Sequence, residues 1–71
     1  MPVDRQVYHV IAEKGKGWKV EKEGSEQALT RAGNKDDAIS AGRRLAKSAG
    51  LGQLIIHRLD GTIEQEFTYG E

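Results

Sequence analysis

The chain has 71 residues, with 11 basic and 11 acidic side chains and a formal net charge of zero. It contains no Cys, so neither a disulfide framework nor a thiolate zinc site is available to stabilise it. The balanced charge gives no overall field that would attract nucleic acid or a membrane surface. We therefore expect residues 1–71 to form one small domain that depends on a single hydrophobic core.

Residues 1–5 are expected to form a loose N-terminus. The first residues lack the apolar region of a secretion signal, and no stretch is long and apolar enough to span a membrane. The sequence therefore favours a cytoplasmic protein.

The first half of the chain predicts a β-hairpin, with strands at residues 6–12 and 18–22 joined by a loop rich in glycine. A five-residue loop places Val10 opposite Val20, whereas a loop shorter by one residue buries the other face of the first strand. The sequence leaves this register open. That other face carries Val7, His9 and Ile11.

Residues 23–33 have the weakest pattern in the chain. A turn is expected at residues 23–25, where Gly and Ser follow Glu. Residues 27–31 are compatible with a short edge strand, but their composition does not decide it. The predicted sheet therefore has four or five strands.

Residues 34–50 predict an amphipathic helix. Asn34 is a favourable N-cap, and two aspartates follow it where the helix dipole is positive. Gly50 ends the helix as a residue with positive φ. Gly42 is expected close to the sheet, because a glycine inside a helix costs about 1 kcal/mol relative to alanine. The apolar stripe consists of Ala38, Ile39, Gly42, Leu45, Ala46 and Ala49.

A second hairpin is predicted from residues 53–59 and 62–69, joined by a two-residue Asp-Gly turn at residues 60–61. This turn places His57 opposite Glu64. The expected pairs are Leu54–Phe67, Ile56–Gln65 and Arg58–Ile63. The side chains expected to face the helix are Leu54, Ile56, Ile63 and Phe67. Those expected on the opposite face are Ile55, His57 and Leu59.

The predicted order is β-β-(β)-α-β-β, with one helix packed on an antiparallel sheet of four to five strands. This arrangement is an α+β fold.

Five segments of the chain share one pattern with a known family and occur in the family's order over nearly the whole length. They are Tyr8-His9-Val10, Gly17-Trp18-Lys19-Val20 with Glu23-Gly24, Asn34-Lys35-Asp36-Asp37-Ala38-Ile39 running into Arg43-Arg44-Leu45-Ala46-Lys47, Ile56-His57-Arg58-Leu59-Asp60-Gly61-Thr62-Ile63, and Thr68-Tyr69-Gly70. The pattern resembles the small bacterial proteins grouped as domain of unknown function 2188. Members commonly begin the helix with Thr or Ser, and Asn34 serves the same capping purpose. The family has no established activity, so the resemblance implies the order of elements and argues against an enzyme without identifying functional residues.

The two histidines are the strongest candidates for chemistry. We interpret the His57–Glu64 pair as a cross-strand charge pair instead of an acid/base dyad, since no nucleophile or second base is placed beside it. His9 joins this pair if the outer faces of the two strands coincide, which would suggest a metal. A flat sheet face without close ligand spacing is nevertheless a poor zinc site. We expect no catalytic residue, no cofactor and no metal.

Two surfaces suggest non-catalytic functions. An apolar second sheet face with Ile55, His57 and Leu59 favours an interaction module, with a homodimer or a protein partner as its occupant. The alternative is weak, sequence-independent binding of nucleic acid by a basic helix face and by the lysines of the first hairpin. The glutamates interleaved with those lysines argue against it. The candidate contacts are Lys14, Lys16, Lys19, Arg43, Arg44 and Lys47.

Overall fold

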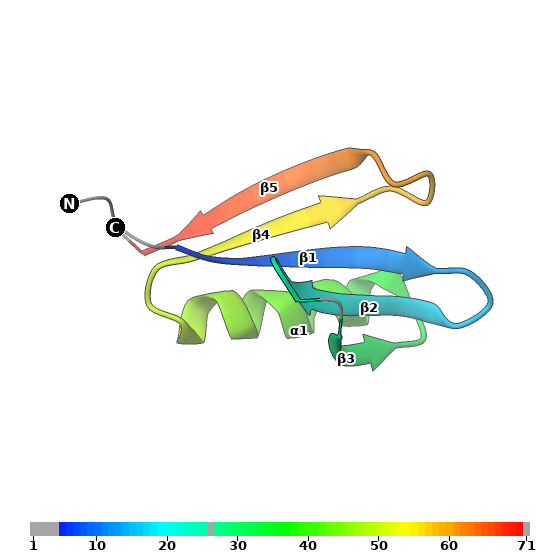
Figure 1. Cartoon of the computed structure of the whole chain (residues 1–71), viewed down its shortest axis with the longest axis horizontal. Coiled ribbons are helices and arrows are strands. Elements are labelled where there is room, and N and C mark those ends of the chain that lie inside the picture. The colour runs from blue at the N-terminus through cyan, green and yellow to red at the C-terminus, as the bar shows by residue number, and fades with distance from the viewer. Residues whose placement is uncertain (1–4, 26, 71) are drawn as a thin grey trace.

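The computed structural model describes residues 5–25 and 27–70, and within them the chain forms five strands and one helix (Figure 1). The elements are β1 (Gln6–Glu13), β2 (Gly17–Lys22), β3 (Ala28–Ala32), α1 (Lys35–Ser48), β4 (Gly52–His57) and β5 (Ile63–Tyr69). The α+β class is confirmed, and the undecided segment forms the edge strand β3. Residues 1–4 of the expected loose terminus lie outside the described residues. Arg5 Nη1 donates to the carbonyl of Tyr69 at 3.1 Å.

The sheet is mixed, so the prediction of an antiparallel sheet is wrong. Its strand order is β3-β2-β1-β4-β5, and the central strands β1 and β4 are parallel. The other neighbours pair antiparallel. The cause is the path of the chain: β1, β2 and β3 form a meander, and α1 then returns the chain along the sheet (Figure 1). Because of this return, β4 runs in the direction of β1.

The first hairpin has the register of the five-residue loop, with Val10 opposite Val20 and Ala12 opposite Trp18. Val10 and Val20 are fully buried. The face of β1 that carries His9 therefore points away from the helix, since successive side chains of a strand alternate between faces.

The second hairpin confirms only part of its predicted register. Leu54 pairs with Phe67 and Ile56 with Gln65, as expected, but the register shifts after Ile56 and places His57 opposite Ile63. The expected pairs His57–Glu64 and Arg58–Ile63 are therefore wrong.

The turn explains the shift. The N–H of Arg58 donates to the carbonyl of Thr62 at 2.7 Å, and the N–H of Gly61 donates to the carbonyl of Arg58 at 2.9 Å. Three residues thus form the loop, with Gly61 at φ +92°, instead of the two in the prediction. Hairpins with such loops commonly contain a bulge, because the extra residue must be accommodated in the ladder.

The bulge moves Ile63 out of the predicted helix-facing layer. Ile63 is 49% exposed, and it shares the face of His57 because directly opposed residues project to the same side. Its neighbour Glu64 forms a salt bridge with Lys35 of α1. The bulge therefore reverses the expected positions of Ile63 and Glu64.

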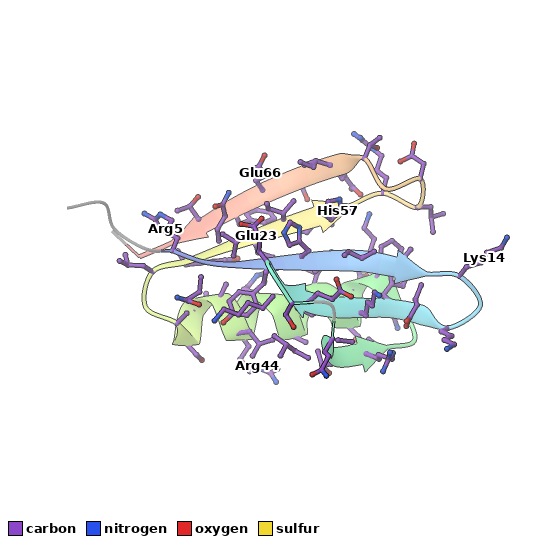
Figure 2. All side chains as sticks on the ribbon, in the orientation of Figure 1. Arg5, Lys14, Glu23, Arg44, His57 and Glu66 are labelled. Carbon is purple, nitrogen blue, oxygen red and sulfur yellow. The ribbon has the colours of Figure 1, made fainter. Side chains whose placement is uncertain are left out.

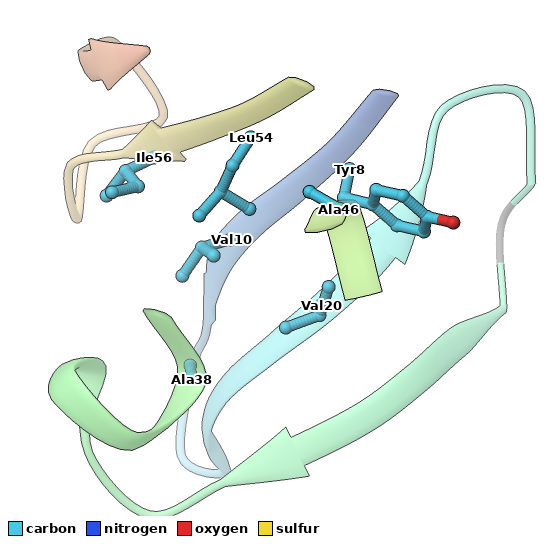
Figure 3. Close-up of a cluster of buried hydrophobic side chains, with 7 residues drawn as sticks. All are labelled: Tyr8, Val10, Val20, Ala38, Ala46, Leu54 and Ile56. Carbon is cyan, nitrogen blue, oxygen red and sulfur yellow. The ribbon is translucent and has the colours of Figure 1, made fainter. Parts of the chain in front are cut away.

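The core lies between α1 and one face of the sheet (Figure 3). The Asn34 side chain accepts a hydrogen bond from the N–H of Asp37 at 2.8 Å, and Gly50 has φ +83°, so both predicted helix ends are confirmed. Gly42 is buried, as expected from its place on the stripe. The buried hydrophobic side chains are Tyr8, Val10, Val20, Ala38, Ala46, Leu54 and Ile56.

Candidate functional site

The face of the sheet opposite α1 is covered by no other element of the described chain. The helix packs against the face that carries Val10 and Leu54, so the alternate residues of the central strands project outward. We call this surface the open face. Its outward residues on β1 and β4 are Val7, His9, Ile11, Gln53, Ile55 and His57. All of them are partly buried by their neighbours within the sheet.

Two histidines meet at the centre of the open face. His9 Nδ1 lies 2.9 Å from His57 Nε2, and the ring centroids are 5.1 Å apart with the ring planes inclined by 29°. The parallel pairing of β1 and β4 places His9 beside Ile55, so His57 lies one side-chain position further along the same face. The sequence raised this meeting as one option, and the structure confirms that the two outer faces coincide.

The outer nitrogen of each ring also has a partner. His57 Nδ1 lies 3.0 Å from the carbonyl oxygen of Gly61, and His9 Nε2 lies 3.1 Å from Glu23 Oε1. The contacts therefore form a continuous chain from the Glu23 carboxylate through both rings to the Gly61 carbonyl. Figure 2 shows Glu23 and His57 over the same part of the sheet.

Glu23 was not predicted as part of this cluster. It lies in the turn after β2, and its backbone N–H donates to the carbonyl of Val7 at 2.8 Å, which fixes the turn beside β1. The Gly that follows Glu23 predicts a turn, but no sequence pattern shows that the turn ends beside His9. The carboxylate expected there was Glu64, which instead contacts α1.

The cluster offers hydrogen-bonding and proton-binding groups. Glu23 is 61% exposed at its side chain, whereas that of His9 is only 20% exposed. Within residues 5–25 and 27–70, no three side chains of His, Asp or Glu are grouped so that they could hold a metal ion. The Glu23 carboxylate lies on the far side of His9 from His57, so these three groups do not converge on one point.

Only two of the three predicted interface residues lie together. Ile55 and His57 are neighbours on β4, but β4 ends at His57, and Leu59 lies in the following turn with 82% of its surface exposed. Leu59 borders a hollow beside the β1–β2 turn. Val7 and Ile11, which were expected to extend the apolar face if they point to the same side as Ile55, do share that side. The residue that the structure adds is Ile63.

Paired charges flank the open face on its β2–β3 side. Lys19 Nζ lies 2.8 Å from Glu21 and 3.8 Å from Glu13, and Arg31 Nε lies 2.9 Å from Glu13. The hydrogen bond from Arg31 lowers the pKa of Glu13, and the hydrogen bond to Glu21 raises the pKa of Lys19. Each of these charges is therefore matched by an opposite charge on the same face.

The candidate nucleic-acid contacts do not form one patch. Lys14 and Lys16 lie in the exposed turn between β1 and β2, and Lys19 lies on the open face among glutamates. The basic residues of α1 lie on the other side of the molecule, and Figure 2 shows Lys14 and Arg44 far apart. The exposed basic residues of the helix are Arg43, Arg44 and Lys47.

Comparison with known families gives one match. Residues 8–69 match the family described as "Uncharacterized protein conserved in bacteria (DUF2188)". The chain belongs to this family. The DUF2188 match covers all six elements except the first residues of β1. It confirms the resemblance drawn from the sequence and assigns no activity.

The other comparisons add no relative. No curated protein and no solved structure matches this DUF2188 chain. In the part of the chain that the structure describes, no helix has the length and apolar character needed to cross a membrane.

Proposed function

We propose that this chain is a non-catalytic interaction module that self-associates by pairing the open face of one copy with that of another. The observation that carries this proposal is the uncovered face of the central strands. Ile55 lies beside His9 in the parallel pair of β1 and β4, with Val7 and Ile11 along the same strand as His9. A short chain has a small core, so it gains stability when such a face is covered.

The distribution of charge favours a second copy as the occupant. The centre of the open face is apolar apart from the two histidines and Gln53, and the charges at its β2–β3 edge are already paired. An apolar centre with a polar rim is the usual composition of a protein interface. The net charge of the chain is zero, so two copies do not repel each other. A two-fold axis needs only this one patch.

Light scattering coupled to gel filtration at micromolar concentrations tests the proposal. Wild-type chain is expected to show a mass that rises from one copy to two with concentration. Ile55→Lys is expected to remain monomeric and folded, because a second copy would bury the new charge. Ile63→Lys, at a half-exposed position of the same face, is the second variant if Ile55→Lys loses its fold.

Leu29→Lys provides the matched control. Leu29 is also about half exposed, but it borders a groove with Leu45 on the helix side of the sheet. This variant makes the same chemical change away from the open face and is expected to associate like the wild type. A wild-type chain that is monomeric at every concentration, or a control that disrupts association equally, contradicts the proposal.

Weak binding of nucleic acid is the second candidate, and the exposed basic face of α1 supports it. Arg43, Arg44 and Lys47 share that face. Mobility shifts with random duplex and single-stranded DNA are expected to weaken steeply with salt if this face binds phosphates. The double variant with Arg43→Ala and Arg44→Ala is then expected to show DNA binding that depends less steeply on salt concentration. The absence of a shift at low salt eliminates this candidate without affecting the first.

A further inference from the structure

The hydrogen bonds of the two histidines require one proton more than two neutral rings carry. The Gly61 carbonyl and an ionised Glu23 carboxylate are acceptors only, so His57 Nδ1 and His9 Nε2 must both donate. A neutral imidazole has one N–H, so the two inner nitrogens would then face each other as lone pairs. They lie 2.9 Å apart, the distance of a hydrogen bond, which places one further proton between them.

Only one protonation state satisfies all three contacts. With one additional proton between the rings, either His9 Nδ1 donates to His57 Nε2 or His57 Nε2 donates to His9 Nδ1, and in both cases His9 Nε2 donates to Glu23 and His57 Nδ1 donates to Gly61. Without that proton, one of the contacts joins two acceptors. With a second additional proton, the N–H groups of the two rings point at each other. The negative charge of Glu23 is balanced by the histidine pair only in the singly protonated state.

Among residues 5–25 and 27–70, Glu23 is the carboxylate that is hydrogen-bonded to the histidine pair, and the other charged groups nearby have partners of their own. Of the residues nearest on each side, Glu21 lies opposite His9 and is bound by Lys19, while Val7 and Ile11 flank His9 along β1. On the β5 side, Ile63 lies opposite His57. In the neighbouring strands, Arg31 donates to Glu13 and Gln53 donates to Glu66. After β4, Arg58 donates to Thr62 and Ile63, and Thr62 donates to Asp60. The helix α1 lies on the opposite face of the sheet.

We propose that Glu23, His9 and His57 form a proton-operated control site for self-association. The site rests on the proposed function, because it lies at the centre of the face that a second copy would cover. The singly protonated site is neutral and fully hydrogen-bonded, so it is compatible with burial. A second additional proton leaves a net positive charge and separates the rings. Association is therefore expected to weaken when the solution is acidified.

Two measurements on the full chain test this site. Imidazole ¹⁵N spectra near neutral pH are expected to show His9 Nε2 and His57 Nδ1 protonated and a third proton held between His9 Nδ1 and His57 Nε2. Sedimentation equilibrium in the presence of EDTA is expected to show that the dissociation constant rises about tenfold or more between about pH 7 and about pH 5. His9→Gln and His57→Gln are each expected to abolish that rise. Glu66→Gln, which removes a carboxylate that contacts Gln53 instead of a histidine, is expected to retain it.

The outcomes separate this site from the proposed function. Two neutral imidazole rings near pH 7, or a dissociation constant that does not change with pH in the wild type, would contradict the control site alone. Association that requires a metal ion and disappears with EDTA also contradicts it. A chain that is monomeric at every pH contradicts self-association, and the control of association fails with it, even where the spectra show the shared proton.

Discussion

A methyl group added at Gly42 would enter the core between α1 and the sheet. A Cβ atom built there lies 2.7 Å from Leu54 Cδ1 and 3.3 Å from Val10 Cγ2. Carbon atoms in contact are normally about 3.5–4.0 Å apart, so Leu54 must move by about 1 Å. Leu54 and Val10 are both fully buried and packed by their neighbours. The added methyl group therefore has no free space to occupy.

Two opposing terms determine the free energy of unfolding of Gly42→Ala. Alanine gains about 1 kcal/mol of helix propensity over glycine. Overpacking of a core typically costs about 1–3 kcal/mol. We expect a net loss of about 0–2 kcal/mol for Gly42→Ala. For Gly42→Leu, which adds a longer side chain at the same point, we expect a loss of about 3 kcal/mol or more.

Thermal unfolding followed by circular dichroism at one fixed protein concentration measures these changes, since self-association makes the midpoint depend on concentration. For a domain of this size, 1 kcal/mol shifts the midpoint by about 4–8 °C. The melting midpoint of Gly42→Leu is expected to lie about 12 °C or more below that of the wild type. Ser40→Ala, at an exposed position of the same helix, is the control and gains up to about 0.7 kcal/mol from propensity alone.

Shortening Leu54 tests the contact itself. Leu54→Val is expected to cost less in the Gly42→Ala background than in the wild type, because the two changes relieve each other. A Gly42→Leu variant that melts at the wild-type midpoint, or a Gly42→Ala variant stabilised by the full helix propensity of about 1 kcal/mol, would show that Gly42 does not pack against Leu54.

Two further positions give predictions of the same kind. Gly52→Ala is expected to destabilise the fold more than Gly42→Ala does. The Cβ at residue 52 would lie against the backbone of Ala46, which cannot rotate away as a side chain can. Chemical denaturation of both variants compares their free energies of unfolding. Asp60→Ala is expected to lower the melting midpoint, because Asp60 Oδ1 accepts from the N–H of Thr62 at 3.0 Å and from its hydroxyl at 2.7 Å. The same hydrogen bonds lower the pKa of Asp60 below its ordinary value of 3.8. The stability that the ionised Asp60 contributes is therefore present above that ordinary value and is lost as the pH falls through the lower pKa of the folded chain. Acid unfolding should therefore show a smaller loss of stability below about pH 4 in Asp60→Ala than in the wild type, and equal acid sensitivity would contradict this role.

The helix and its packing were predictable because local signals agree with each other. Asn34, Gly50 and the apolar stripe each indicate the same element, and the structure uses all of them. The direction of β4 was also within reach of the sequence. A meander of three strands followed by a returning helix makes the fourth strand parallel to the first, whereas the prediction assumed antiparallel neighbours throughout.

The composition of the histidine cluster was not predictable, because it depends on a single inserted residue. The Asp-Gly sequence at residues 60–61 indicates a two-residue turn, but the chain forms a three-residue loop that begins at Leu59. The compensating bulge exchanges the positions of Ile63 and Glu64. A shift of one residue reverses which face a side chain occupies, so the candidate site changed although both strands were predicted.

The glutamate that does contact His9 comes from a turn that has no periodicity. Residues 23–25 predict a turn from composition alone, which says nothing about where the turn lies relative to β1. The position of Glu23 follows from its backbone hydrogen bond to Val7 and thus from the register of the first hairpin. The sequence left that register open.

Isotope-filtered nuclear Overhauser spectra of a mixture of ¹³C-labelled and unlabelled chain test the central claim most directly, because they detect contacts between copies only. Intermolecular contacts to the methyl groups of Val7, Ile11 and Ile55 on the open face are expected. Intermolecular contacts confined to the helix side, at Leu29 and Leu45, or no such contacts at a concentration where light scattering shows a dimer, would contradict the claim that the open face is the interface.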